Sequence, residues 1–133
     1  MSYAIRLTES LFPAQTDSQV QSITIGEQLK LTAQAYPQEI ALVEVDIDGD
    51  IGRSWTWSSL LTECEEQAFA LANRFLPGER VTVWSPNTPE WVIMEFACAM
   101  AGIVIVTANP ALQARELRYI LDQSESVALF LVE

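Results

Sequence analysis

The packed part of the chain begins with a helical pattern. Apolar side chains recur at helical intervals from Ile25 to Tyr36, and Pro37 prevents the helix from continuing. Thr24 and Glu27 have the spacing of a capping box, in which each side chain bonds the backbone of the other residue. The pattern predicts a helix that starts directly after Thr24.

An alternating pattern follows. From Ala41 to Ile47 aliphatic side chains alternate with acidic ones, and the alternation returns from Ile51 to Trp57. A period of two residues is typical of a strand, and Asp48-Gly49 between the two runs is a strong turn dipeptide. The segment is predicted to form a β-hairpin.

A second helical pattern comes next. Thr56 or Ser58 can cap the helix, and Pro77-Gly78 ends it. We expect one apolar stripe to face the core, formed by Leu60, Cys64, Ala68, Leu71, Ala72 and Phe75.

After Gly78 the chain alternates short apolar runs with helical segments. Thr88-Pro89 opens a helix that runs to Gly102, and a further helix begins near Gln113. The strands are expected at Val81–Trp84, Ile103–Thr107 and Val127–Val132. This alternation predicts an α/β fold, in which a hairpin and helices precede βαβαβ units that form a small parallel sheet. The strand order is left open.

One folded unit is expected. Residues 1–22 show no sustained period and are interpreted as an extended lead-in, and residues 23–133 as the α/β unit. Half of the 133 residues are hydrophobic and 19% are charged, which is typical of a packed globular chain and excludes disorder. The longest stretch without polar side chains, Phe96 to Val106, is too short to cross a bilayer.

Charge and missing residue types restrict the function. Eighteen acidic against seven basic residues give a net charge of −11, which disfavours nucleic acid and anionic lipid as partners. The chain has no histidine, so it supplies no imidazole base and no His-ligated zinc site. Its one lysine, Lys30, is expected on a helix surface. The acidic run is interpreted as a solvated helix face, and it comprises Glu63, Glu65 and Glu66.

The two cysteines, Cys64 and Cys98, lie in apolar helical stretches and do not form a Cys-x-x-Cys pair. We interpret them as buried free thiols. The N-terminal residues lack the basic and apolar regions of a signal peptide. A reducing, cytoplasmic setting is therefore expected.

No ligand motif in the chain is complete. Alternating Asp46, Asp48 and Asp50 resemble the start of a calcium loop, but Ile51 and Trp57 stand where that loop needs glycine and glutamate. The glycines form no phosphate loop, since they lie at 26, 49, 52, 78 and 102.

In an open α/β sheet a ligand site forms beyond the carboxyl ends of the strands. The loops at those ends are Ser85-Pro86-Asn87 and Ala108-Asn109-Pro110. Their amides and hydroxyls can position a ligand but cannot activate a nucleophile unaided, and turn formation is their simpler role.

Several segments resemble the N-terminal region of AMP-forming acyl-CoA synthetases, members of the adenylate-forming superfamily. The resemblance begins near Thr24 and extends to the end of the chain. Trp55 to Leu60 is similar to the first core motif of the family, and Met100 to Pro110 to the second. Further runs that match the family are Gly78–Trp91 and Glu116–Leu121. Asn109-Pro110 and the helix that contains Trp91 are more similar to fatty-acyl-CoA ligases than to peptide-synthetase domains.

The resemblance implies a two-step ligase reaction for the full-length enzyme. A carboxylate, implied to be a fatty acid, attacks the α-phosphate of Mg-ATP to give an acyl-adenylate and pyrophosphate, and coenzyme A then displaces AMP. The family's phosphate loop, magnesium-binding glutamate, ribose-binding aspartate, hinge and C-terminal lysine have no counterpart here. No catalytic, cofactor-binding or metal-binding residue is therefore assigned. Fold-shaping positions of the second motif are Gly102, Asn109 and Pro110.

We therefore expect an N-terminal fragment of such a synthetase, truncated before the phosphate loop and inactive by itself. The alternative is a noncatalytic interaction or dimerisation module with the same fold. In both cases the last strand, Val127–Val132, leaves an open sheet edge that favours self-association. The acyl chain length and the acceptor thiol are not specified by these residues.

Overall fold

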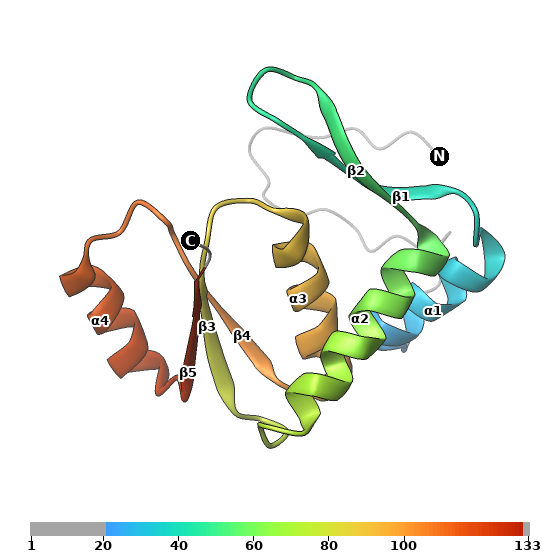
Figure 1. Ribbon diagram of the computed structural model, residues 1–133. Coiled ribbons are helices and arrows are strands. Elements are labelled where there is room, and N and C mark those ends of the chain that lie inside the picture. The colour runs from blue at the N-terminus through green and yellow to red at the C-terminus, as the bar shows by residue number, and fades with distance from the viewer. Residues whose placement is uncertain (1–20, 132–133) are drawn as a thin grey trace, which may run out of the picture.

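The computed structural model describes residues 21–131 and has the predicted α/β architecture (Figure 1). Most of the interpreted lead-in, residues 1–20, lies outside the described part, and residues 21–24 precede the first helix without regular structure. Within the described part no helix is both long enough and apolar enough to span a bilayer.

The first helix, α1 (Ile25–Ala35), begins as its capping box predicts. The backbone N–H of Glu27 donates to Thr24 Oγ1 at 3.1 Å, and the N–H of Thr24 donates to Glu27 Oε2 at 2.9 Å. Two N–H groups that a helix start leaves without partners are thereby satisfied. The predicted start is confirmed.

The predicted hairpin is present but shorter than expected. Strands β1 (Ile40–Val45) and β2 (Ile51–Thr56) pair antiparallel, with irregular register on both sides of Val43. Ile47 lies in the turn and not in a strand. Trp57 begins the next helix because Thr56 caps it, accepting a hydrogen bond from the N–H of Ser59 at 3.2 Å.

The hairpin also turns the opposite way from what its pattern suggests. The exposed side carries Val43, Val45 and Ile47, which are 39%, 58% and 101% exposed. Leu42 and Glu44, on the other side of β1, are partly covered. Amphipathic alternation normally buries the apolar face, whereas this hairpin leaves that face exposed.

The long helix α2 (Trp57–Ala72) buries the centre of its predicted stripe, while Ala72 at its end is exposed. The next helix, α3 (Pro89–Ala101), has Pro89 at its first position. Gly102 follows with φ +72°, a left-handed conformation that suits glycine and ends the helix.

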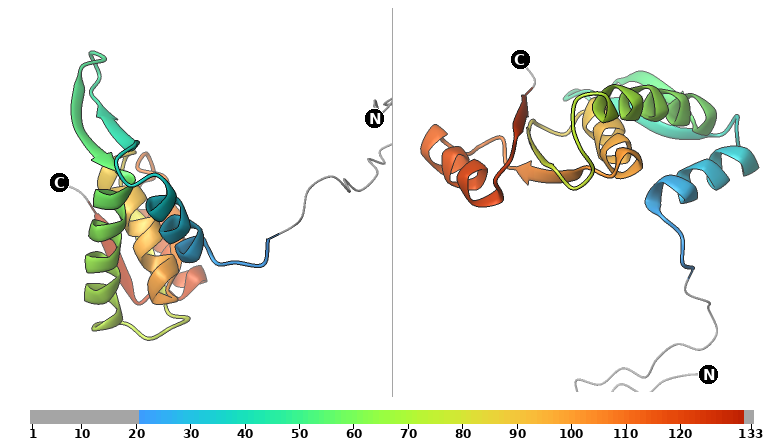
Figure 2. Two further views of the ribbon diagram at one scale, coloured as in Figure 1. Left: turned by 90° about the vertical axis from the view of Figure 1, so that its right-hand side faces the viewer. Right: turned by 90° about the horizontal axis from the view of Figure 1, so that it is seen from below.

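The three remaining strands form the parallel sheet. They are β3 (Arg80–Trp84), β4 (Val104–Ala108) and β5 (Ala128–Leu131), in the order β4-β3-β5. Helix α4 (Ala114–Ser124) connects β4 to β5. Two views show α2 and α3 on one side of the sheet and α4 on the other (Figures 1 and 2).

Two hydrophobic clusters hold these elements together. The sheet core joins α2 and α3 to the sheet and contains Ala68, Leu71, Val81, Val83, Met94, Ala97, Cys98 and Ile103. The hairpin core joins α1, α2, β2 and α3 and contains Leu29, Trp55, Leu60, Cys64 and Ile93. Helix α2 contributes to both clusters, which makes it the common support of the sheet and the hairpin.

Candidate functional site

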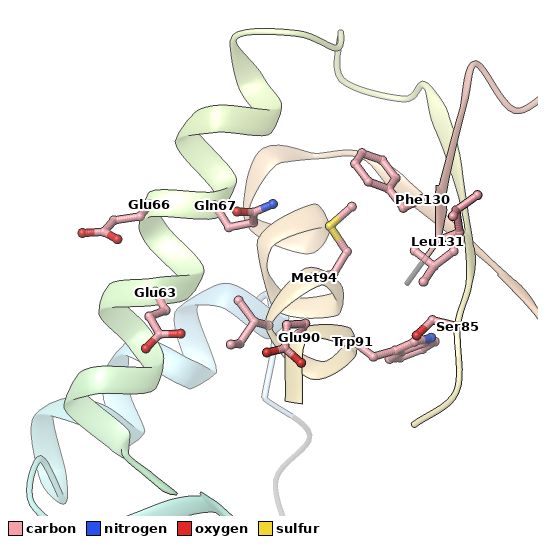
Figure 3. Close-up of a pocket in the computed structure, with 11 residues that line it drawn as sticks. Glu63, Glu66, Gln67, Ser85, Glu90, Trp91, Met94, Phe130 and Leu131 are labelled. Carbon is pink, nitrogen blue, oxygen red and sulfur yellow. The ribbon is translucent and has the colours of Figure 1, made fainter. Parts of the chain in front are cut away.

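A cavity of about 590 Å³ lies between α2, α3 and the carboxyl ends of β3 and β5 (Figure 3). This is the position at which open α/β sheets collect ligands. The apolar part of its lining comes from Val83, Trp91, Ile93, Met94, Phe130 and Leu131. The polar part comes from Glu63, Glu66, Gln67, Ser85 and Glu90.

Helical spacing positions most of these side chains. On α2, Glu63, Glu66 and Gln67 stand three and four residues apart and so share one face. On α3, Glu90 and Trp91 occupy the first turn and are followed at the same spacing by Ile93 and Met94. Figure 3 shows Gln67 between the two helices, Met94 on the side of α3 that faces Phe130, and Trp91 close to Ser85 at the strand ends.

The polar lining is acidic. Among the residues that the structure describes, no lysine or arginine lines the cavity, while three glutamates do. Two of them already have partners, because Glu63 accepts a hydrogen bond from Trp55 Nε1 at 2.8 Å and Glu90 accepts one from Arg53 at 2.6 Å. The bond from Arg53 is the main cause that holds the pKa of Glu90 below its usual value. Such a lining disfavours phosphates and free carboxylates as ligands.

The groups that could act as nucleophiles are not activated. The Ser85 side chain is buried, and its Oγ donates to the carbonyl of Pro86 at 2.9 Å. Among the described residues this hydroxyl makes no hydrogen bond to a carboxylate, and the chain has no histidine to serve as its base.

Both cysteines are completely buried free thiols, as predicted, and neither lines the cavity. Burial raises the pKa of Cys64 to about 12 and that of Cys98 to about 11, so both are protonated at neutral pH.

A second cavity, of about 520 Å³, lies between the hairpin and the start of α3. Glu44 and Gly52 line it from the hairpin, and Asn87, Thr88 and Pro89 from the other side. Thr88 has the extended backbone of an N-cap residue, but its side chain makes no capping hydrogen bond and its Oγ1 is buried without a partner. The predicted cap is thus present in position only.

The two loops singled out at the strand ends have different roles. Ser85 lines the first cavity and Asn87 the second. Asn109 instead forms a turn, since its Oδ1 accepts from the N–H of Ala111 at 2.9 Å and its carbonyl accepts from Trp84 Nε1 at 3.0 Å. Of these two loops, the one after β3 contributes to the two cavities described above.

The remaining polar candidates belong to turns or to the surface. Asp46 Oδ1 accepts from the N–H groups of Asp48 and Asp50, which makes the apparent calcium motif a turn. Lys30 is half-exposed on α1 and pairs with Glu65 at 3.2 Å, as expected for a surface residue. In residues 21–131 no three acidic, cysteine or histidine side chains are arranged to hold a metal ion.

Sequence reasoning missed most of the cavity lining. The acidic face of α2 was seen, but only as a solvated surface, and Glu63 and Glu66 lie at the cavity edge. Trp91 was noted only in the segments that resemble the family, at the end of the run Gly78–Trp91, and Met94 was not singled out. A usable signal was the shared face of Glu63 and Gln67, one turn apart and next to the buried stripe of α2.

Comparisons with known proteins agree on one family. Residues 29–133 match the family described as AMP-binding enzyme. The chain is 38% identical over 115 residues to the mitochondrial medium-chain acyl-CoA ligase ACSF2 of Homo sapiens, a match that covers 86% of this chain and 18% of the ligase. The chain therefore spans about a fifth of the length of the curated relatives it matches.

Solved structures show the same fold. A fatty acyl CoA synthetase of Mycobacterium tuberculosis superposes with a TM-score of 0.72 at 27% identity, over 81% of this chain and 21% of that one. The N-terminal subdomain of NpsA from Klebsiella oxytoca superposes with a TM-score of 0.73 at 22% identity, over 81% of this chain and 27% of that one.

Proposed function

This chain belongs to the AMP-binding enzyme family and corresponds to the N-terminal region of an AMP-forming ligase, and on that premise we propose its function. It is a structural part of an acyl-CoA ligase that activates a fatty acid with ATP. By itself the 133-residue chain does not catalyse the reaction. The fatty-acid substrate and the use of ATP, magnesium and coenzyme A rest on the family and on the names of the relatives.

The expected inactivity rests on the acidic lining of the larger cavity. Adenylate formation needs positive charge beside the phosphates of ATP and a place for the metal ion that accompanies them. In the part of the chain that the structure describes, the larger cavity is lined by glutamates and by no lysine or arginine, and no cluster of residues could hold a metal ion. The residues present therefore do not fit ATP or magnesium.

The first experiment measures ATP–pyrophosphate exchange by the isolated chain with acids from acetate to palmitate. We expect no exchange above the rate without protein. Exchange that depends on one of these acids would contradict the proposed inactivity.

The second experiment tests the ligase role directly. The 115 matching residues of the human ligase are replaced by their counterparts from this chain, and the same exchange is measured with medium-chain acids. We expect measurable exchange, because the fold and more than a third of the residues are shared. The same chimera with Leu71→Asp in the sheet core is the unfolded control. A folded chimera without exchange would count against the ligase role.

A second candidate is a noncatalytic module that binds another copy of itself. The observation in its favour is β5, an edge strand in which no residue is fully buried and which is flanked by Val127 at 55% exposure and ends in Leu131 at 54%. Sedimentation velocity across micromolar concentrations tests it, and a monomer at every concentration would exclude it.

A reducing, cytoplasmic location also stays a prediction. The burial of both free thiols supports it, and fractionation of cells that express the tagged chain would test it.

A further inference from the structure

The side chain of Arg53 connects two elements that are distant in the sequence. From β2, its Nε and Nη2 donate to the carboxylate of Glu44 at 2.8 and 2.9 Å. Its Nη1 donates to Glu90 in the first turn of α3 at 2.6 Å. The guanidinium also lies 5.2 Å from the centroid of the Trp55 ring. We call Arg53, Glu44 and Glu90 the Arg53 network.

No other ion pair among the described residues has this geometry. Lys30–Glu65 is one contact at 3.2 Å, and Arg80–Glu125 and Arg118–Asp122 are single contacts at 3.5 Å. The two-pronged bond from Arg53 to Glu44 lies within the hairpin and fixes the orientation of the guanidinium. The guanidinium held in this way presents Nη1 to Glu90 on α3, so this contact between the two elements needs less ordering of the arginine side chain than an isolated exposed pair.

Glu90 is the residue that allows the positively charged Arg53 to contact the N-terminus of α3. The N-terminus of a helix carries partial positive charge and repels a cation. Arg53 can lie there because the carboxylate of Glu90, in the first turn of α3, accepts its hydrogen bond. The pKa values reflect the same bonds: hydrogen bonds with Arg53 hold the pKa of Glu44 at about 2 and that of Glu90 below its usual value.

Gly52 leaves room for the Glu44 carboxylate beside β2. A Cβ at Gly52 would lie 3.0 Å from Glu44 Oε2, so a larger residue there would make the carboxylate shift. Within the network, Glu44 lines the second cavity and Glu90 lines the first. The ion pairs therefore stand between the two cavities.

We propose that Arg53 is a positioning residue that holds the hairpin against the first turn of α3 and so sets the wall between the two cavities. The hairpin needs such a contact, because its outer face is exposed and a two-stranded hairpin is marginal alone. Trp55 packs in the hairpin core near the end of β2. Arg53, two residues earlier in β2, makes the contact with α3. This role does not depend on the ligase assignment.

Amide hydrogen exchange on the full chain tests the proposal, with Arg53→Met compared with Arg80→Met as the matched control. We expect Arg53→Met to speed exchange about threefold to fivefold in β1, β2 and the first turn of α3, and to leave β3 and β4 unchanged. Arg80→Met should leave the hairpin unchanged. Equal hairpin exchange in the two variants, or a uniform increase over the whole chain, would overturn the proposal.

Glu90→Gln separates positioning from general stability. It removes the negative charge from the contact to α3 and so weakens that contact, while Arg53 stays on Glu44, so it tests the proposal even if Arg53→Met does not fold. We expect faster hairpin exchange in Glu90→Gln, and unchanged hairpin exchange would contradict the role. The cavity is monitored in Arg53→Met, because Arg53 lines neither cavity. We expect shifted NMR signals of the Met94 methyl and the Trp91 indole, which line the first cavity, and unmoved signals would contradict the role. Arg53→Lys, which keeps the charge but loses the two-pronged pair, should show a partial effect.

Discussion

The sheet and the hairpin of this protein are held by different kinds of contact. The parallel sheet is covered by α2 and α3 on one face, and Val81 at its centre is completely buried. The hairpin buries one large side chain, Trp55, and exposes its other face, where it relies on the Arg53 network. Apolar residues with the same strand propensity therefore contribute unequally to the free energy of unfolding, because the contribution depends on how far each side chain is buried and not on its type.

The largest effect should come from a matched pair of valines. Val83 is 4% exposed in β3 and Val45 is 58% exposed in β1. We expect Val83→Ala to lower the free energy of unfolding by about 2–3 kcal/mol, because it removes buried methyl groups and leaves a cavity. Val45→Ala should cost less than about 0.5 kcal/mol. Urea unfolding checks both values, and similar losses would show that the hairpin face is covered in solution.

Two glycines with positive φ sharpen the comparison. Gly102 (φ +72°) ends α3, and a Cβ there would meet Pro77 Cβ at 3.4 Å, whereas Gly49 (φ +88°) has open space around it. We expect Gly102→Ala to lower global stability by about 1–2 kcal/mol, because alanine is strained in this conformation. Gly49→Ala should mainly speed exchange of hairpin amides, since its strain acts on an element that opens locally. Equal shifts in the melting temperature would contradict this division.

The two cysteines report on the two regions separately. Cys64 lies in the hairpin core and Cys98 in the sheet core, and both are completely buried. In the variants Cys98→Ala and Cys64→Ala, which keep one thiol each, we expect the Cys64 thiol to react with a thiol reagent about fivefold faster than the Cys98 thiol. The reason is that a less stable region opens more often. Faster labelling of Cys98 would show that the sheet core opens more often than the hairpin core.

The smallest effect concerns pH. Bonds with Arg53 lower the pKa of Glu44 from its ordinary 4.5 to about 2. A carboxylate whose pKa is lower in the folded state stabilises fully above its unfolded pKa and loses that contribution as pH falls toward its folded pKa. Hairpin protection should therefore decline between about pH 4.5 and pH 2 before the sheet changes. Hydrogen exchange over this range measures it, and Glu44→Gln should flatten the decline.

Local patterns along the chain were sufficient to predict most elements. The capping box of Thr24 and Glu27, the stop at Pro37 and the proline start of α3 act within one helical turn, so neighbouring residues determine them. The resemblance to AMP-forming acyl-CoA synthetases was also readable from the sequence, and the family match over residues 29–133 confirms it.

Only the tertiary structure decided the strand order β4-β3-β5, the exposed face of the hairpin and the lining of the cavities. Each depends on contacts between residues far apart in the chain. Arg53 and Glu90 are 37 positions apart, and nothing in either local pattern indicates that they meet. Alternation shows that β1 has an apolar and a polar side, but the packing of α2 and α3 determines which side is covered.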